Sequence, residues 1–142
     1  MGRIKQSQIT YWCHEIIRSQ AEAGGCYIDA TMGKGNDTLF LCELAGENGK
    51  VLAFDIQQEA LDATRELLRI HGKEQQAELI LDGHEHMDRY AMEESTDVIC
   101  FNFGYLPGGD HKLATTYQTS IEAIGKGLGI LKHGGMMSLC IY

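Results

Sequence analysis

The apolar residues of this chain form five short continuous runs, separated by stretches with helical spacing. The runs cover residues 26–30, 50–54, 77–81, 98–101 and 136–141. Runs of this length that are apolar at nearly every position are typical of strands buried on both faces of a sheet. Strands that alternate with helices predict right-handed βαβ units and a parallel sheet. The pattern therefore predicts an α/β fold.

The stretches around these runs have the period of amphipathic helices. The clearest helix is expected over residues 57–71, ended by Gly72, with others over residues 37–45 and 117–131. An opening helix should pack an apolar stripe on the sheet. This stripe consists of Ile9, Trp12, Cys13, Ile16 and Ile17. Because no linker or repeat interrupts the chain, we expect residues 1–142 to form one domain with helices on both faces of the sheet.

The segment after the first predicted strand indicates a site for a nucleoside cofactor. Asp29 ends this strand and is followed by a turn that contains Gly33 and Gly35. The second strand ends in Asp55, where a carboxylate can accept hydrogen bonds from two ribose hydroxyls. Ligands of open α/β sheets bind at the carboxyl ends of parallel strands, so these residues should lie together.

The spacing of the glycines favours S-adenosylmethionine over NAD. A dinucleotide-binding turn has a third glycine where this chain has Thr38. Asp29 would fit poorly against a pyrophosphate and well beside the ammonium group of a methionine moiety; alternatively, it caps the turn. The N–H groups of the turn, at the positive end of the next helix, should bind the cofactor's carboxylate. The turn consists of Gly33, Lys34, Gly35, Asn36 and Asp37.

Composition limits the partners and the compartment. The net charge of -8 argues against a nucleic-acid partner, because Lys and Arg supply most of the affinity for phosphates, although basic residues could still gather on one face. The five cysteines are dispersed and odd in number, which predicts buried, reduced thiols in a cytoplasmic protein. No run approaches the roughly 18 apolar residues of a membrane span, so we expect no membrane partner.

His84 and His86 allow a metal-site interpretation, since histidines two positions apart on a strand share a face. No third ligand follows at a characteristic spacing. We therefore expect no metal.

Four segments together carry a family resemblance: residues 29–37, 54–57, 82–85 and 101–110. The chain resembles the class I S-adenosylmethionine-dependent methyltransferases of the rRNA methylase family, which have a Rossmann-like fold. Members of this family are known as the bacterial tRNA enzymes that methylate 5-aminomethyluridine at the wobble position. The resemblance covers almost the whole chain and implies S-adenosyl-L-methionine as cofactor and tRNA as substrate.

The resemblance also implies roles for individual residues at the cofactor. Asp55 would bind the cofactor ribose, with Gln57 close by. Gly83 and His84 would border the adenine.

Asn102 and Tyr105 are the catalytic candidates that the resemblance implies. Asn102 stands where amino-methylating enzymes of this fold carry an Asn-Pro-Pro-Tyr motif, whose amide oxygen accepts a hydrogen bond from the target amine. Here Phe103 and Gly104 replace the proline pair. Tyr105 would stack on a base. Alternatively, residues 103–105 form a tight loop packed on the core.

The substrate amine must bind neutral or lose its proton before it is methylated. The candidate proton acceptors are Asp110, His111 and His84.

Family members continue beyond the position of Tyr142 into an antiparallel hairpin. We therefore expect the domain to be truncated at its C-terminus, without this hairpin. The last strand would then present an unpaired apolar edge that favours a homodimer. Two other functions stay open. They are a small-molecule methyltransferase, which the acidic composition would suit better, and an NAD-binding oxidoreductase or cofactor-binding module.

Overall fold

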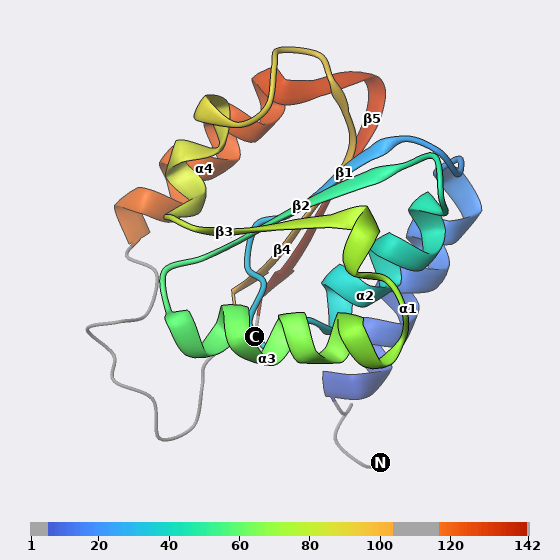
Figure 1. Cartoon of the computed structure of the whole chain (residues 1–142). Helices are drawn as coiled ribbons and strands as arrows, with labels where there is room; N and C mark the ends of the chain where they lie inside the picture. The colour runs from blue at the N-terminus through green and yellow to red at the C-terminus, as the bar shows by residue number, and fades with distance from the viewer. Residues whose placement is uncertain (1–5, 104–116, 142) are drawn as a thin grey trace, which may run out of the picture.

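The computed structural model describes residues 6–103 and 117–141, and these residues form one five-stranded sheet (Figure 1). Neighbouring strands pair in parallel, in the order β3-β2-β1-β4-β5. The strands are β1 (Cys26–Asp29), β2 (Lys50–Asp55), β3 (Ala77–Leu81), β4 (Thr96–Phe103) and β5 (Leu131–Ile141). The predicted α/β fold with a parallel sheet is confirmed.

Helices cover both faces of the sheet (Figure 1). One face carries α1 (Gln6–Gln20), α2 (Asn36–Ala45) and α3 (Gln58–Ile70). The other carries α4 (Tyr117–Ile130) and the 3-10 helix η2 (His84–Arg89). A second 3-10 helix, η1 (Glu74–Gln76), leads into β3. None of the helices in the described ranges is long and apolar enough to cross a membrane.

The side chains of β4 separate two apolar cores. Val98 and Cys100 pack with the helices α1 to α3, whereas Ile99 and Phe101 pack on the side of α4. This alternation follows from the pleat of a strand, in which successive side chains point to opposite faces. Asn102 comes next and therefore lies on the same face as Cys100. β4 thus places a polar side chain at the margin of the core beneath α1 and α2.

The apolar stripe of α1 is rotated relative to the prediction. Ile17 is buried, but Trp12 is 51% exposed and Ile16 is 54% exposed, so the packing expected for these two residues is wrong. The helix docks on β5 and on α2, and its inward side includes Cys13 and the polar His14. A helix that contacts a neighbouring helix as well as a sheet can bury polar residues, which apolar periodicity does not reveal.

The last strand begins earlier than predicted, at Leu131 instead of residue 136. Thr96 of β4 pairs with Leu131, and Val98 then pairs with Met136, so β5 contains an irregular insertion. Gly134 in this insertion has a φ of +83°, which favours glycine. The insertion is a bulge, and it hides the start of the strand from a pattern based on apolar runs.

Candidate active site

Polar residues gather at one edge of the sheet, where the carboxyl ends of four adjacent strands meet. Asp29 ends β1, Asp55 ends β2 and Asn102 is the last residue but one of β4. Asp82 and Gly83 follow β3 and lead into η2. Because β3, β2, β1 and β4 are neighbours in this order, the sheet brings together residues that the sequence predicts separately.

Asp55 anchors the turn between β1 and α2. Its Oδ2 accepts a hydrogen bond from the N–H of Gly33 at 3.0 Å, and its Oδ1 accepts one from the N–H of Gln57 at 2.9 Å. Gln57 is the capping residue before α3. A carboxylate offers about four lone-pair positions, so each oxygen of Asp55 can accept a further hydrogen bond.

The glycine turn lies directly on α3. Gly33 and Gly35 have φ values of +53° and +92°. A Cβ on Gly35 would lie 2.7 Å from the Oγ1 of Thr64, so a larger residue would displace this helix. The Thr64 hydroxyl also donates a hydrogen bond to the carbonyl of Gly33, at 3.2 Å. The sequence places Thr64 on the inward face of its helix but contains no signal for this contact.

Two of the N–H groups of the turn are engaged within the fold. Gly33 donates to Asp55, and Gly35 donates to the carbonyl of the residue three positions before it. Among the described residues, the N–H groups of Lys34, Asn36 and Asp37 have no hydrogen-bond partner. The side chains of Lys34 and Asn36 are exposed.

Asp29 is fully buried beneath the turn. Its Oδ1 accepts a hydrogen bond from the N–H of Thr31 at 3.2 Å, and its Oδ2 accepts one from the hydroxyl of Thr38 at 2.6 Å. Burial, and then the neighbouring Asp37 carboxylate, raise the pKa of Asp29 to about 7. The hydroxyl at position 38, where a dinucleotide-binding turn would have glycine, thus satisfies a buried carboxyl group.

The buried Asp29 makes the stability of the chain depend on pH. Its folded-state pKa of about 7 lies above the ordinary value of 3.8, so between these values the folded chain holds a proton that the unfolded chain has released. The contribution of Asp29 to the free energy of unfolding should therefore fall as the pH rises from about 4 to about 7. We expect Asp29→Asn to remove this slope and to be about 1–2 kcal/mol more stable than the native chain at pH 8, since the amide is uncharged but loses one acceptor. Urea unfolding at pH 4 and pH 8 measures both effects; a slope retained in the variant would contradict the assignment.

His84 presents an unpaired ring nitrogen at the same edge. The side chain is 5% exposed, and its Nδ1 lies 3.0 Å from the carbonyl oxygen of Ala30. Because a carbonyl only accepts, Nδ1 carries the proton and Nε2 is an acceptor. Nε2 has no hydrogen-bond partner in the described part of the chain. Burial lowers the pKa of His84, which keeps the imidazole neutral near pH 7.

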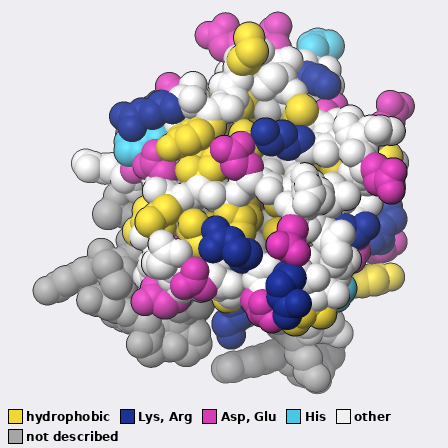
Figure 2. Space-filling model, viewed as in Figure 1, with side chains coloured by type: hydrophobic (Ala, Val, Ile, Leu, Met, Phe, Trp, Pro, Cys, Tyr) yellow, Lys and Arg dark blue, Asp and Glu magenta, His cyan; other side chains and the backbone are white. Residues whose placement is uncertain are grey.

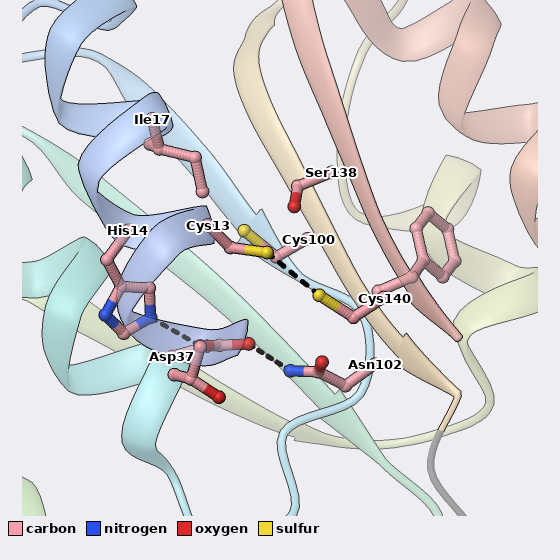
Figure 3. A pocket seen from close by; sticks show the side chains of 10 residues that line it. Cys13, His14, Ile17, Asp37, Cys100, Asn102, Ser138 and Cys140 are labelled. Carbon is pink, nitrogen blue, oxygen red and sulfur yellow. Dashed lines mark hydrogen bonds and ion pairs between the residues drawn. The ribbon is translucent and has the colours of Figure 1, made fainter. Parts of the chain in front are cut away.

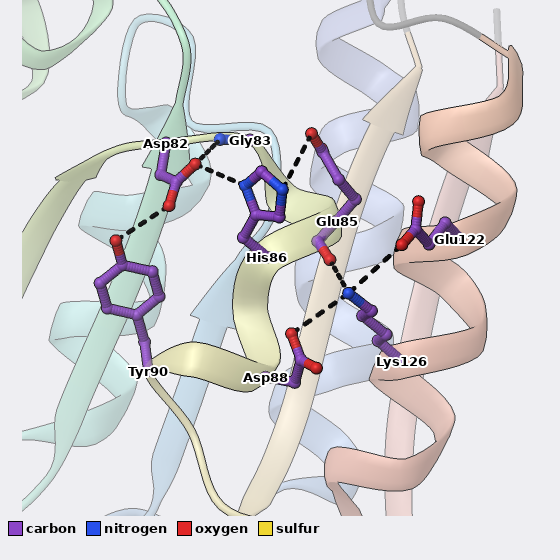
Figure 4. Close-up of polar contacts among 8 residues, drawn as sticks. All are labelled: Asp82, Gly83, Glu85, His86, Asp88, Tyr90, Glu122 and Lys126. Carbon is purple, nitrogen blue, oxygen red and sulfur yellow. Dashed lines mark hydrogen bonds and ion pairs between the residues drawn. The ribbon is translucent and has the colours of Figure 1, made fainter.

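A polar network holds the segment that carries Gly83 and His84 (Figure 4). Asp82 accepts hydrogen bonds from the N–H of Gly83 at 2.8 Å, from His86 at 2.7 Å and from the Tyr90 hydroxyl at 2.9 Å. The hydrogen bond from His86 in particular lowers the pKa of Asp82. These contacts fix the start of η2 against the end of β3, so that Gly83 and His84 reach the site.

Lys126 connects α4 to η2. Its Nζ donates to the Glu85 carbonyl and forms ion pairs with Asp88 and Glu122 at 3.3 Å each (Figure 4). On the face that Figure 2 shows, basic and acidic side chains are likewise interspersed. Lys126 is thus neutralised locally instead of adding to a basic patch.

Asn102 is held in place by α2 (Figure 3). Its backbone N–H donates to the Thr31 hydroxyl at 2.7 Å, and its Nδ2 donates to Oδ2 of Asp37. The other oxygen of Asp37 lies 2.6 Å from Nε2 of His14 on α1. Asn102 Oδ1 is buried and accepts no hydrogen bond from any described residue. The sequence predicts Asp37 and Asn102 but not their contact, and it does not indicate His14.

Three thiols lie beside the hydrogen-bonded side chains of His14, Asp37 and Asn102. The Sγ atoms of Cys13 and Cys140 are 3.0 Å apart, and Cys100 lines the same small pocket (Figure 3). Burial raises the pKa of Cys140 to about 12 and that of Cys100 well above its ordinary value, so both stay neutral. All five thiols are free, but Cys26 is exposed, so the prediction that the cysteines are buried is wrong for this residue.

The remaining predictions concern three residues after β4 and the histidine pair. Tyr105, Asp110 and His111 belong to residues 104–116, outside the described residues. His84 and His86 lie on a 3-10 helix instead of a strand and contact different partners, so they do not share a face as a metal pair would. Within residues 6–103 and 117–141, no group of three or more His, Cys, Asp or Glu side chains could hold a metal ion.

Sequence comparison identifies the family. The model of the family described as "Putative rRNA methylase" matches residues 51–142, which is more than half of the chain. The chain belongs to this family. A curated relative, the chloroplastic tRNA (mnm(5)s(2)U34)-methyltransferase of Arabidopsis thaliana, is 33% identical over 99% of the chain. The chain spans about half of that relative's length, namely 54%.

Solved structures of rRNA methylases share the fold closely. An rRNA methylase from Streptococcus thermophilus is 37% identical, with a TM-score of 0.79 over 99% of this chain and 74% of that one. A "putative methyltransferase" from Streptococcus mutans, solved in complex with SAH, is 38% identical, with a TM-score of 0.82 over 96% of this chain and 73% of that one. A [4+2]-cyclase also matches, at 14% identity and a TM-score of 0.67, so the fold alone does not determine the chemistry.

Proposed function

We propose that the chain is the catalytic domain of an S-adenosylmethionine-dependent methyltransferase that methylates the aminomethyl nitrogen of a tRNA wobble uridine. The observation that carries the proposal is the Asn102 side chain. Its Nδ2 donates a hydrogen bond to Asp37, which leaves its buried Oδ1 as an unpaired acceptor. This oxygen lies at the same edge of the sheet as Asp29 and Asp55, which end β1 and β2. The name of the Arabidopsis relative, a tRNA (mnm(5)s(2)U34)-methyltransferase, and the SAH bound to the Streptococcus mutans protein support this choice.

The residues at the sheet edge fit the parts of the cofactor. Asp55 has lone pairs left for two ribose hydroxyls. The unpaired N–H groups of Lys34, Asn36 and Asp37 lie at the N-terminal end of α2, where a carboxylate is stabilised. When bound, S-adenosylmethionine supplies a methyl group on a positively charged sulfur.

Gly83, Asp29 and Gln57 complete the proposed cofactor site. Gly83 borders the adenine together with His84, whose Nε2 suits an amino group because it only accepts. Asp29, buried beneath the turn, would interact with the ammonium group of the methionine moiety. Gln57 lies next to Asp55 through the hydrogen bond of its N–H.

The chain's task in methyl transfer is to place the amine. Asn102 Oδ1 accepts one N–H of the amine and thereby aims its lone pair, and such positioning can supply up to about 7–11 kcal/mol of the barrier lowering. His84 is a weak proton acceptor because burial lowers its pKa. An amine that binds in its neutral form needs no acceptor at this site. Tyr105 is proposed to stack on the target base.

The test is methyl incorporation from radiolabelled S-adenosylmethionine into bulk tRNA, compared with a pool of small metabolites. Nucleoside mass spectrometry should then find the label on a 5-aminomethyluridine. Label in the metabolite pool alone would support a small-molecule methyltransferase, which the net charge of -8 suits better. Calorimetry with S-adenosylmethionine and NAD distinguishes both kinds of methyltransferase from an oxidoreductase, since we expect only S-adenosylmethionine to bind.

We also propose that the chain self-associates in the cytoplasm through its edge strand. β5 pairs with β4 on one side, and its Leu139 and Ile141 are 45% and 76% exposed. An exposed apolar edge recruits a second chain. Sedimentation at micromolar concentration should show a homodimer, and Leu139→Lys should shift it toward monomer. A native chain that stays monomeric at all concentrations would refute this proposal.

A further inference from the structure

The two ends of the Asn102 amide differ in chemistry, and Asp37 distinguishes between them. The Nδ2 group donates a hydrogen bond to Oδ2 of Asp37, whereas Oδ1 has no partner among the described residues. A carboxylate can only accept hydrogen bonds. If the amide were turned by half a rotation, its oxygen would face the carboxylate and two acceptors would repel each other. Asp37 therefore selects one of two orientations that are almost equal in shape.

His14 restricts Asp37 in turn. Its Nε2 lies 2.6 Å from Oδ1 of Asp37, and the two side chains are only 18% and 12% exposed. The imidazole ring stacks on Phe40, with the ring centroids 3.9 Å apart and the ring planes 5° from parallel. Phe40 is buried and follows Asp37 by three positions on α2. Shielding from water strengthens such polar contacts, so helix α1 holds the carboxylate from the side opposite to Asn102.

We infer that His14 and Asp37 are positioning residues that keep Asn102 Oδ1 turned toward the N–H of the substrate amine. The inference rests on the proposed function, because that function supplies the amine whose N–H would bind the unpaired Oδ1 of Asn102. With the amide reversed, its NH2 group would meet the N–H of the amine and the guiding hydrogen bond would be lost. The inference assigns a catalytic support role to α1, through a residue that never touches the substrate.

Three variants separate positioning from packing. Asp37→Asn keeps the shape but can donate to Asn102 Oδ1 and so stabilises the reversed amide. His14→Phe keeps the ring on Phe40 but loses the N–H donor. His14→Gln loses the ring but keeps an N–H group within similar reach. His71→Gln, which changes the exposed histidine directly after α3, is the matched control.

The kinetic readout is methyl transfer to tRNA that carries 5-aminomethyluridine. Asp37→Asn and His14→Phe should lower kcat about 10–100-fold, with KM for tRNA within about threefold of the native value, because only the aim of the amine changes. His14→Gln should recover kcat to within about threefold of native. Native kcat in both Asp37→Asn and His14→Phe would overturn the inference, and so would a His14→Gln variant no better than His14→Phe.

A second readout needs no substrate. The side-chain amide of Asn102 is observed by 15N NMR and assigned by its loss in Asn102→Ala. In the native chain its protons should exchange slowly and one should be shifted downfield by the carboxylate; both features should disappear in Asp37→Asn. An unchanged Asn102 resonance in Asp37→Asn and His14→Phe would overturn the inference. If the native chain transfers no methyl group to tRNA, the proposed function fails, and the NMR comparison still decides the amide orientation. Should Asp37→Asn not fold, the two His14 variants decide.

Discussion

Replacing Asp55 by alanine is expected to weaken the binding of S-adenosylmethionine by about 2–4 kcal/mol, because two ribose hydroxyls lose a charged acceptor. In calorimetry this corresponds to an increase in Kd of about 30- to 1,000-fold. The structure makes the effect large for a second reason. Asp55 also holds the N–H groups of Gly33 and Gln57, so the turn that faces the cofactor is loosened at the same time.

A cofactor analogue separates the ribose contact from the turn. The native chain should bind 2′-deoxy-S-adenosylhomocysteine more weakly than S-adenosylhomocysteine, whereas Asp55→Ala should hardly distinguish the two ligands. Asp62→Ala, an exposed carboxylate on α3, serves as the matched control and should bind both like the native chain. The ribose assignment is wrong if Asp55→Ala keeps the native Kd, or if it still distinguishes the two ligands as the native chain does.

Replacing Asn102 by alanine is expected to lower kcat by about 100-fold or more, while the Kd for S-adenosylmethionine changes by less than about threefold. The lost oxygen contacts the reacting nitrogen and not the cofactor. Its neighbours Asp37 and Thr31 remain in place, so the carboxyl end of β4 should keep its structure. Single-turnover methylation of tRNA at saturating cofactor measures the chemical step directly.

Two comparisons sharpen this result. Asn48→Ala, an exposed asparagine in the turn before β2, controls for the loss of an amide and should behave like the native chain. Thermal unfolding shows whether Asn102→Ala stays folded. If cofactor binding weakens as much as kcat falls, Asn102 belongs to the cofactor pocket and not to the amine site.

The sequence alone determined where the strands lie, apart from the start of β5, together with the glycine turn and the carboxylate at the end of β2. The run at residues 26–30 contains β1, because a strand covered by helices on both faces must be apolar along most of its length. The glycines of the turn can be predicted from the sequence for a similarly local reason. Only glycine adopts the left-handed conformation of Gly35 without strain while also allowing the approach of Thr64.

Only the tertiary structure decided which polar atoms meet. His14 lies 23 positions before Asp37, and Asn102 lies 65 positions after it, on three different elements. Their contact depends on how far α1 is rotated about its axis and on where it crosses α2. Apolar periodicity left this rotation undetermined and led to the wrong burial of Trp12 and Ile16. Sequence determines local backbone structure through short-range preferences. Hydrogen bonds between elements depend on docking angles, which arise from the packing of the whole core.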